Sequence, residues 1–197
     1  MARPSNKEQI LDAGLEVVRR RGFTAAGVRE ITSAASVPQG SFTNHFASKE
    51  AFGLEILDRY FADVRSLTAE TLTAETLGAE RDPVERLRGY FDAITDRLEA
   101  RGWRHGCLVG NLSLESAEHS EAIRTRLAEI FAEWRAPFVH CLEEAAAQGR
   151  ITLTVPAPDL ADFLLASWQG AILRMKVERT PEPLHRFKDV VFTTVLR

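Results

Sequence analysis

Residues 10–52 read ILDAGLEVVRRRGFTAAGVREITSAASVPQGSFTNHFASKEAF, and this stretch decides the fold because it predicts three short helices in close succession. Apolar residues recur at helical spacing until Gly22, a residue type that commonly ends helices. A second helix is expected over about 27–35 and a third over about 38–46, separated by a tight turn at 36–38. Two helices joined in this way are typical of a helix-turn-helix.

The third expected helix has the dimensions of a DNA-reading element. At ~1.5 Å per residue it is about 12 Å long, close to the ~12 Å width of a B-DNA major groove. Phe42 and Phe46 lie four residues apart and should anchor it inward. Its other residues are mostly small or carry amides, and Gln and Asn can bond adenine bidentately. The side chains that could reach base edges are Gln39, Ser41, Thr43 and Asn44.

The same stretch, about forty residues long, resembles the DNA-binding domain of TetR-family repressors. The resemblance rests on Gly22-Phe23-Thr24, on Val37-Pro38-x-Gly40-Ser41-Phe42 and on His45-Phe46-x-Ser48-Lys49-Glu50. It implies binding to double-stranded, palindromic operator DNA, with Thr24, His45 and Lys49 on phosphates. Arg3 and Lys7 could reach a minor groove or the DNA backbone from an N-terminal arm. The candidate DNA-binding residues are Thr24, Arg29, Gln39, Gly40, Ser41, Thr43, Asn44, His45 and Lys49.

Several positions depart from the pattern of that family. Thr43 stands where a Tyr is usual, and Gln39 stands where Lys or Arg is common. Asn44 and His45 replace a pair that usually contains an aromatic residue or His. Phosphate contacts supply most of the affinity and base contacts supply selectivity, so these changes weaken phosphate contact and alter base readout. The operator sequence therefore cannot be carried over from a relative.

The whole chain is expected to be all-α, with about nine helices, because strong helix formers dominate and no segment alternates with period two for long. The resemblance implies a three-helix DNA-binding domain over 1–47 and a helical ligand-sensing and dimerisation domain over 48–197. It also implies a homodimer that pairs through its last two helices. Those helices, expected over about 159–178 and 184–196, carry more apolar surface than one small domain needs, which fits a two-fold four-helix interface.

Two further segments resemble a subgroup of the family that includes N-ethylmaleimide-type electrophile-responsive repressors and acrylate-responsive repressors. They read HGCLVGNLSLE over 105–115 and WQGAILRMK over 168–176. Cys107 lies near the expected start of a helix and close to cations, which lower a thiol pKa and favour the thiolate that adds to activated alkenes. Lys176, in the second segment, is expected to supply one such cation.

The alternative for Cys107 is a small buried apolar side chain, which is how free Cys often behaves in a core. On that interpretation the protein senses a small organic acid or a hydrophobic ligand without covalent chemistry. Aromatic walls with a few polar groups make a small-molecule site. The candidate sensing residues are Trp103, Cys107, Asn111, Glu115, Trp134, Trp168 and Lys176. Cys141, in an apolar helical stretch, is expected only to pack.

Composition and charge are those of a globular protein with a basic end. The chain has 197 residues, 45% of them hydrophobic and 27% charged, with a formal net charge of −3. The first fifty residues carry seven basic and five acidic groups, net +2, whereas the remainder carries 18 and 23, net −5. A basic N-terminal quarter indicates an end that meets polyanions. No apolar run approaches ~20 residues and there are two cysteines, so we expect a cytoplasmic protein with reduced thiols and no membrane span.

Three other classes of protein fit the sequence less well. An enzyme is disfavoured because there is no Gly-rich phosphate loop and no His-Glu-x-x-His, and the five histidines are scattered. A metal-responsive regulator is disfavoured because His105 with Cys107, and His140 with Cys141, lack the spacing of a structural zinc site. A helical scaffold without DNA binding stays open because of the departures in the third helix. We therefore expect no cofactor and no metal.

Overall fold

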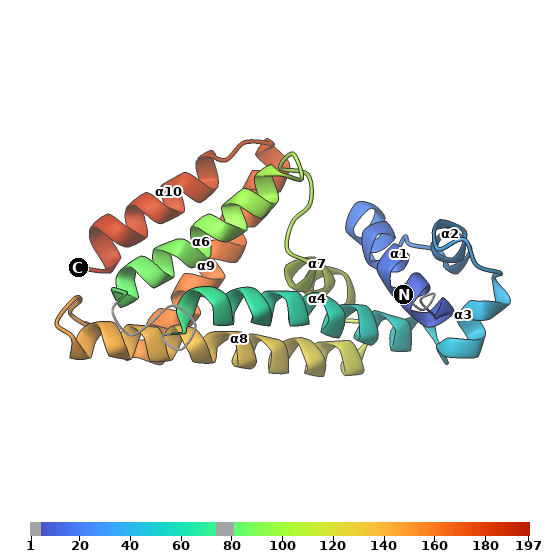
Figure 1. Ribbon diagram of the computed structural model, residues 1–197, viewed down its shortest axis with the longest axis horizontal. Helices are drawn as coiled ribbons and strands as arrows, with labels where there is room; N and C mark the ends of the chain where they lie inside the picture. Colours follow the sequence, from blue (N-terminus) through green and yellow to red (C-terminus); the bar gives the residue numbers. More distant parts are fainter. Residues whose placement is uncertain (1–4, 74–80) are drawn as a thin grey trace. The chain divides into compact units, whose positions relative to one another are not determined.

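The computed structural model describes residues 5–73 and 81–197, and all regular secondary structure in these residues is helical (Figure 1). The prediction of an all-α chain with about nine helices is confirmed for this part of the chain. Arg3, and Leu77, near which the helix after Ser48 is expected to end, lie outside the described residues. The helices are α1 (Asn6–Arg21), α2 (Val28–Ala34), α3 (Gly40–His45), α4 (Lys49–Leu72), α6 (Pro83–Glu99), α7 (Leu108–Ser116), α8 (Glu121–Ala147), α9 (Ala157–Glu178) and α10 (Glu182–Val190), followed by the π-helical turn η1 (Val191–Val195).

The chain divides into two compact units. The first comprises the residues up to Ala62 together with Leu108–Glu129, and the second comprises Asp63–Cys107 and Ile130–Arg197. The division falls inside α4 and α8, so each unit holds part of both helices. The expected domain boundary at 47/48 comes directly after the helix-turn-helix. It concerns domains that fold separately, and it stays a prediction. The compact first unit includes the helix-turn-helix together with α7 and the first part of α4.

Aromatic rings hold the helix-turn-helix together in the first unit. Phe42 and Phe46, the two expected anchors of α3, are buried, and their ring centroids lie 5.3 and 5.2 Å from that of Phe52 in α4. Phe52 in turn lies against the backbone of α1 at Gly14, where an added Cβ would come within 2.4 Å of its ring. Gly14 therefore allows the close approach of α1 and α4, and any larger residue would displace the ring.

Polar contacts fix the N-terminal end of α1. The Ser5 hydroxyl accepts the backbone N–H of Glu8 at 3.3 Å and so caps the helix. The Glu8 carboxylate accepts a bond from Arg59 of α4 at 2.6 Å, and Asp12 pairs with the same guanidinium at 2.7 Å. The hydrogen bond that Arg59 donates to Glu8 is the largest of the contacts that raise the pKa of Arg59. These contacts set the position of α1 on α4.

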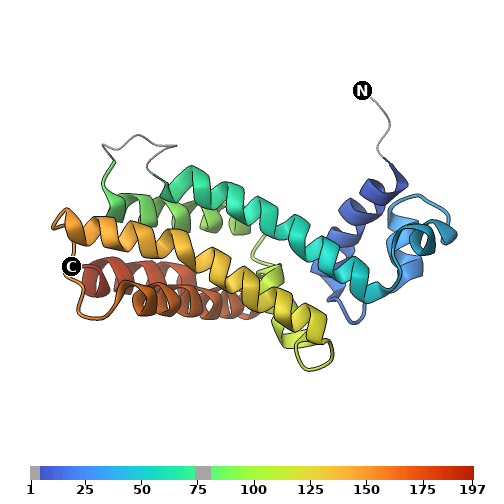
Figure 2. The same cartoon turned by 90° about the horizontal axis from the view of Figure 1, so that it is seen from below.

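An aromatic core fills the second unit. The ring of Phe91, in α6, lies 4.9 Å from that of Trp168 in α9 and 5.0 Å from that of Phe187 in α10. Tyr90, the preceding residue, packs its ring 5.0 Å from that of Phe138 in α8. Figure 2 shows α9 and α10 side by side, and the two helices pack on each other. The core therefore ties α6, α8, α9 and α10 into one body.

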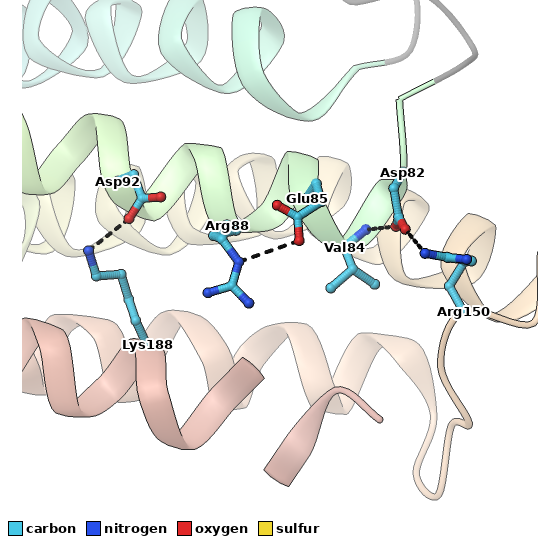
Figure 3. A network of polar contacts seen from close by, with 7 residues as sticks. All are labelled: Asp82, Val84, Glu85, Arg88, Asp92, Arg150 and Lys188. Carbon is cyan, nitrogen blue, oxygen red and sulfur yellow. Dashed lines mark hydrogen bonds and ion pairs between the residues drawn. The ribbon is translucent and has the colours of Figure 1, made fainter. Parts of the chain in front are cut away.

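Ion pairs and a helix cap line α6 where it meets its neighbours (Figure 3). Asp82 caps the helix by accepting the Val84 N–H at 2.8 Å, and its other oxygen pairs with Arg150, from the turn after α8. Further along α6, Asp92 pairs with Lys188 of α10 at 2.7 Å. Asp82 and Pro83 thus start α6, and the carboxylates of Asp82 and Asp92 each pair with a cation from another part of the second unit.

A buried charge joins α6 to α8. The side chain of Arg86 is 1% exposed and forms an ion pair with Glu144. Close by, Cys141 is fully buried, and its thiol donates to the carbonyl of Pro83 at 3.3 Å. Burial raises the pKa of Cys141 to about 12, against the opposing charge of Arg86 and with a further rise from neighbouring carboxylates. The prediction that Cys141 packs in the core is confirmed, and its thiol stays protonated at neutral pH.

Candidate nucleic-acid interface and sensing segment

The predicted recognition helix is shorter than expected but presents a polar face. Helix α3 begins at Gly40, and the Pro38 carbonyl accepts the Ser41 N–H at 2.9 Å, so residues 38–39 form the turn that leads into it. A Cβ added at Gly40 would meet no atom within 4 Å, which leaves the backbone open to a close partner. Five of the candidate DNA-binding residues are exposed in and around α3, namely Gln39, Gly40, Thr43, Asn44 and His45.

The structure corrects the prediction that Ser41 belongs to this exposed face. It is only 8% exposed, and its hydroxyl accepts a hydrogen bond from the side-chain amide of Asn6 in α1 at 3.4 Å. The physical reason is that Ser41 and Phe42 share the buried side of the first turn of a six-residue helix, where α1 covers them. The Ser41 hydroxyl therefore faces α1 and is not placed to reach a base edge.

A second group of candidate residues meets at the N-terminal end of α4. The ammonium of Lys49 donates to the carbonyl of Thr24 at 2.9 Å and lies 5.0 Å from the centroid of the Phe23 ring. The backbone N–H of Thr24 donates to Glu115 of α7 at 2.9 Å. Burial lowers the pKa of Lys49, and the charge of Glu115 opposes that shift. Glu115, expected among the sensing residues, thus lies in the first unit against the predicted phosphate contacts.

Two other predicted contacts lie in the first unit. Arg29 is exposed on α2. Lys7, expected to reach DNA from an N-terminal arm, belongs to the first turn of α1 and pairs with Glu55 at 2.7 Å. The arm interpretation of Lys7 is therefore corrected, because helix α1 begins before this residue and fixes it.

The sensing segment begins at the N-terminus of α7. Cys107 directly precedes Leu108, the first residue of α7, which confirms its expected place at a helix start, and the side chain is 6% exposed. The hydroxyl of Tyr90, fully buried, accepts the indole N–H of Trp134 at 2.7 Å. Burial raises the pKa of Tyr90, and a thiolate charge on Cys107 raises it further. Cys107 is therefore within electrostatic reach of a buried Tyr–Trp pair.

Sequence reasoning missed Tyr90. It lies in the helix after Asp82-Pro83, in a stretch with Leu87 and Phe91 at helical spacing, and so resembles an ordinary core residue. The available signal was its hydroxyl, since a buried Tyr usually needs a hydrogen-bond partner. The chain has only two tyrosines, so the need for such a partner could be recognised from the sequence. The identity of the partner could not.

The remaining sensing candidates are distributed over both units. Trp168 is fully buried in the aromatic core, and its indole N–H has no hydrogen-bond partner among the described residues. Trp103 lies in the turn after α6 with φ +60°, and its carbonyl accepts a bond from Arg179 at 3.3 Å. Lys176 lies in the last turn of α9, whereas Asn111 belongs to α7 in the first unit. Cys107, Trp134 and Trp168 are thus the predicted residues that share the interior of the second unit.

Helices α9 and α10 present an apolar face that the described chain leaves uncovered. A groove runs between them, lined among others by Ala171, Pro183 and Phe187. The large apolar side chains exposed on these helices are Phe163, Leu173, Val177 and Val190. Such a face is typical of an association surface.

Two further properties of the described residues bear on function. Within 5–73 and 81–197, no helix is long and apolar enough to cross a bilayer. In the same ranges no three His, Cys, Asp or Glu side chains are grouped so that they could hold a metal ion.

Comparison with known proteins gives matches over nearly the whole chain. Residues 10–56 match the family described as bacterial regulatory proteins, tetR family, and residues 83–191 match the tetracyclin repressor-like C-terminal domain. The transcriptional repressor DhaR of Mycobacterium sp. (strain GP1) is 46% identical over the entire chain and 95% of its own length. The regulator AcuR of Cereibacter sphaeroides is 34% identical over 91% of the chain and 80% of its length. A crystal structure of the reduced form of E. coli NemR superposes with a TM-score of 0.85 at 28% identity, covering 98% of each chain.

Proposed function

Because this chain belongs to the TetR family of bacterial transcriptional regulators, we propose that it is a repressor that holds palindromic operator DNA as a homodimer and releases it in response to a small molecule or to modification of Cys107. The two family matches confirm the membership that the motifs of residues 10–52 predict. The family and these relatives are regulators of transcription and not enzymes. The observation that carries the proposal is the exposed polar face of α3 beside the corner formed by Thr24 and Lys49.

The proposed DNA contacts fall into two kinds. Gln39, Thr43 and Asn44 would read base edges from α3, because they are exposed and carry amide or methyl and hydroxyl groups that match adenine and thymine. Thr24, His45 and Lys49 would contact phosphates, which position the protein without reading sequence. Arg29 and Gly40 complete the set, the first as a nearby cation and the second by leaving room for the DNA backbone.

Single substitutions separate these two kinds of contact. Lys49→Ala is expected to weaken binding to all duplexes alike and to lower the salt slope of log K by about one per protomer, whereas Asn44→Ala should cost about 1–3 kcal/mol at one base pair and relax selectivity there. Fluorescence anisotropy over a series of salt concentrations, with a duplex from upstream of the protein's own gene, measures both. An unchanged salt slope for Lys49→Ala would contradict the phosphate assignment.

The homodimer is proposed to form through α9 and α10. The exposed apolar side chains and the groove between these helices are the surface that a two-fold partner would cover in a four-helix interface. A two-fold axis repeats the recognition helix, and the two copies would have to lie roughly 34 Å apart, one turn of DNA, to read a palindrome. Operator release would then follow from a change in that spacing.

The proposed signal acts at the start of α7. The thiolate of Cys107 would attack the β-carbon of an activated alkene and form a C–S bond, and the resulting carbanion would take a proton from water. Cys107 directly precedes Leu108, the first residue of α7. The description of the E. coli NemR structure as a reduced form concerns that protein, and it supports testing thiol chemistry in this one.

One observation favours a second candidate, a non-covalent sensor. Cys107 is only 6% exposed, which gives the thiol little access to reagents in the folded state. On this alternative a small organic acid or hydrophobic ligand occupies the aromatic interior of the second unit, Lys176 pairs with an acidic group, and Cys107 only packs.

A cysteine substitution decides between the two. The Cys107→Ser variant is expected to bind the upstream duplex as the wild type does, but to stay bound when N-ethylmaleimide or acrylate is added. The Cys141→Ser variant is the control and should still be released, because the raised pKa of Cys141 keeps that thiol unreactive. Gel-shift titrations give the result, and release of Cys107→Ser at the wild-type concentration would favour the non-covalent sensor.

A further inference from the structure

The carboxylate near the end of α7 holds the same corner of the first unit that is proposed to grip phosphates. Glu115 accepts the N–H of Thr24, and Lys49 donates to the carbonyl of that same residue, each at 2.9 Å. One anion therefore faces an amide donor and lies near an ammonium, both of which the proposed function assigns to DNA. Sequence patterns do not reveal this arrangement, because Thr24 and Glu115 are 91 positions apart.

The turn that ends α1 is shaped around this carboxylate. Gly22 has φ +85°, and a Cβ added to it would lie 3.0 Å from both carboxylate oxygens of Glu115. Glycine adopts such a φ without the strain that other residues meet, and it also leaves the space that the carboxylate occupies. The contact is thus part of how the turn folds, and not a passing approach of two surface side chains.

The segment that carries Glu115 has other attachments to α4. The Ser120 hydroxyl donates to Glu50, and Arg126 pairs with Asp58 at 2.7 Å. These contacts lie on the far side of the turn after α7 and do not use Glu115. A change that neutralises Glu115 would therefore leave the segment in place, so that it tests the charge and not the packing.

We propose that Glu115 is an internal anion that competes with DNA phosphate for Lys49 and for the Thr24 amide, and so sets the affinity of the DNA-binding unit. This inference rests on the proposed function, in which Thr24 and Lys49 contact phosphates. Carboxylate and phosphate oxygens accept the same charge-assisted hydrogen bonds. A phosphate that reaches these donors must displace the carboxylate or lie close to it, and like charges repel, so either arrangement weakens binding.

The test compares Glu115→Gln with Glu118→Gln. Glutamine keeps an oxygen that can accept the Thr24 N–H and removes only the charge, while Glu118, exposed in the turn after α7, gives the same change in net charge away from the corner. An exposed charge pair changes binding by about threefold. A dimer on two half-sites loses two such charges, so Glu115→Gln should bind about tenfold more tightly than wild type. Because phosphate contacts do not read sequence, the gain should be equal on the upstream duplex and on a random-sequence duplex of the same length.

The outcomes are distinguishable by fluorescence anisotropy, with a thermal melt of each variant as the check on folding. A gain for Glu115→Gln that exceeds the gain for Glu118→Gln on both duplexes supports the competition. Equal affinities of the two variants overturn it, and so does weaker binding by Glu115→Gln with an unchanged melting temperature, since the carboxylate would then support the contact. Failure of the wild type to bind either duplex would contradict the proposed function itself.

Discussion

Replacing Leu173 by Glu is expected to convert the protein to monomers and to lower its affinity for a palindromic operator by more than about a hundredfold. Leu173 is 49% exposed on α9, beside the groove that separates α9 from α10. In the proposed dimer this side chain is buried, and a carboxylate there would have to lose its water without a partner, which costs several kcal/mol. A monomer then reaches only one half-site, and losing the second forfeits the 10²–10⁴-fold gain of linked binding.

The control for this substitution is Val155→Glu. Val155 is a comparably exposed apolar residue of the second unit, 46% exposed, but it precedes α9 and does not line the groove. It should remain dimeric and bind the operator as the wild type does. Light scattering coupled to gel filtration gives the mass of each variant, and anisotropy gives its affinity. A Leu173→Glu protein that still has the mass of a dimer would rule out this face as the interface.

The second large effect is expected from Glu144→Ala. Its partner Arg86 is almost completely buried, and one nitrogen of the guanidinium, Nε, already lacks a hydrogen bond among the described residues. Removing the carboxylate leaves a buried charge without compensation, which typically costs about 3–5 kcal/mol. For a chain of this size the melting temperature should fall by about 10 °C. Circular dichroism melts measure the change.

Glu143→Ala provides the matched control, since Glu143 is the exposed neighbour on the same turn of α8. Its melting temperature should stay within about 1–2 °C of the wild type, as is usual for surface substitutions. The double variant Arg86→Met with Glu144→Gln should recover part of the loss, because it removes the buried charge as well. If Glu144→Ala melts like Glu143→Ala, the ion pair does not stabilise the second unit.

The helix-turn-helix could be predicted because its signals are local. Gly22 ends α1, the turn at 36–38 separates two short helices, and Phe42 and Phe46 lie four residues apart. Ser41 could not be placed from the same signals, because its burial depends on Asn6, 35 residues away in α1. In a six-residue helix, the apolar spacing does not determine whether a residue next to the buried face is itself buried or exposed. The packing of a neighbouring helix determines it.

The candidate site was less predictable because its contacts join distant parts of the chain. Glu115 is one acidic residue among 28, and its partner Thr24 contributes a backbone amide, which no pattern of side chains can reveal. Tyr90 meets Trp134 across 44 residues and two helices. Cys107 and Trp168 lie in the two segments of the subgroup resemblance, and Trp134 was a candidate as an aromatic wall of a small-molecule site. The bond between Tyr90 and Trp134 depends on how α6 and α8 pack, which the sequence does not encode in any one segment.

The placement of the tryptophans has an optical consequence. All three, Trp103, Trp134 and Trp168, lie in the second unit, and the first unit contains none. Intrinsic tryptophan emission therefore reports on the second unit without a background from the first unit, which is proposed to hold DNA. The indole of Trp134 donates to Tyr90, whose hydroxyl is within electrostatic reach of Cys107, so its emission should respond to alkylation or to an inducer. A dye on the DNA follows operator occupancy. When one sample is observed at two wavelengths, the order of the tryptophan response and the release of the operator can be measured.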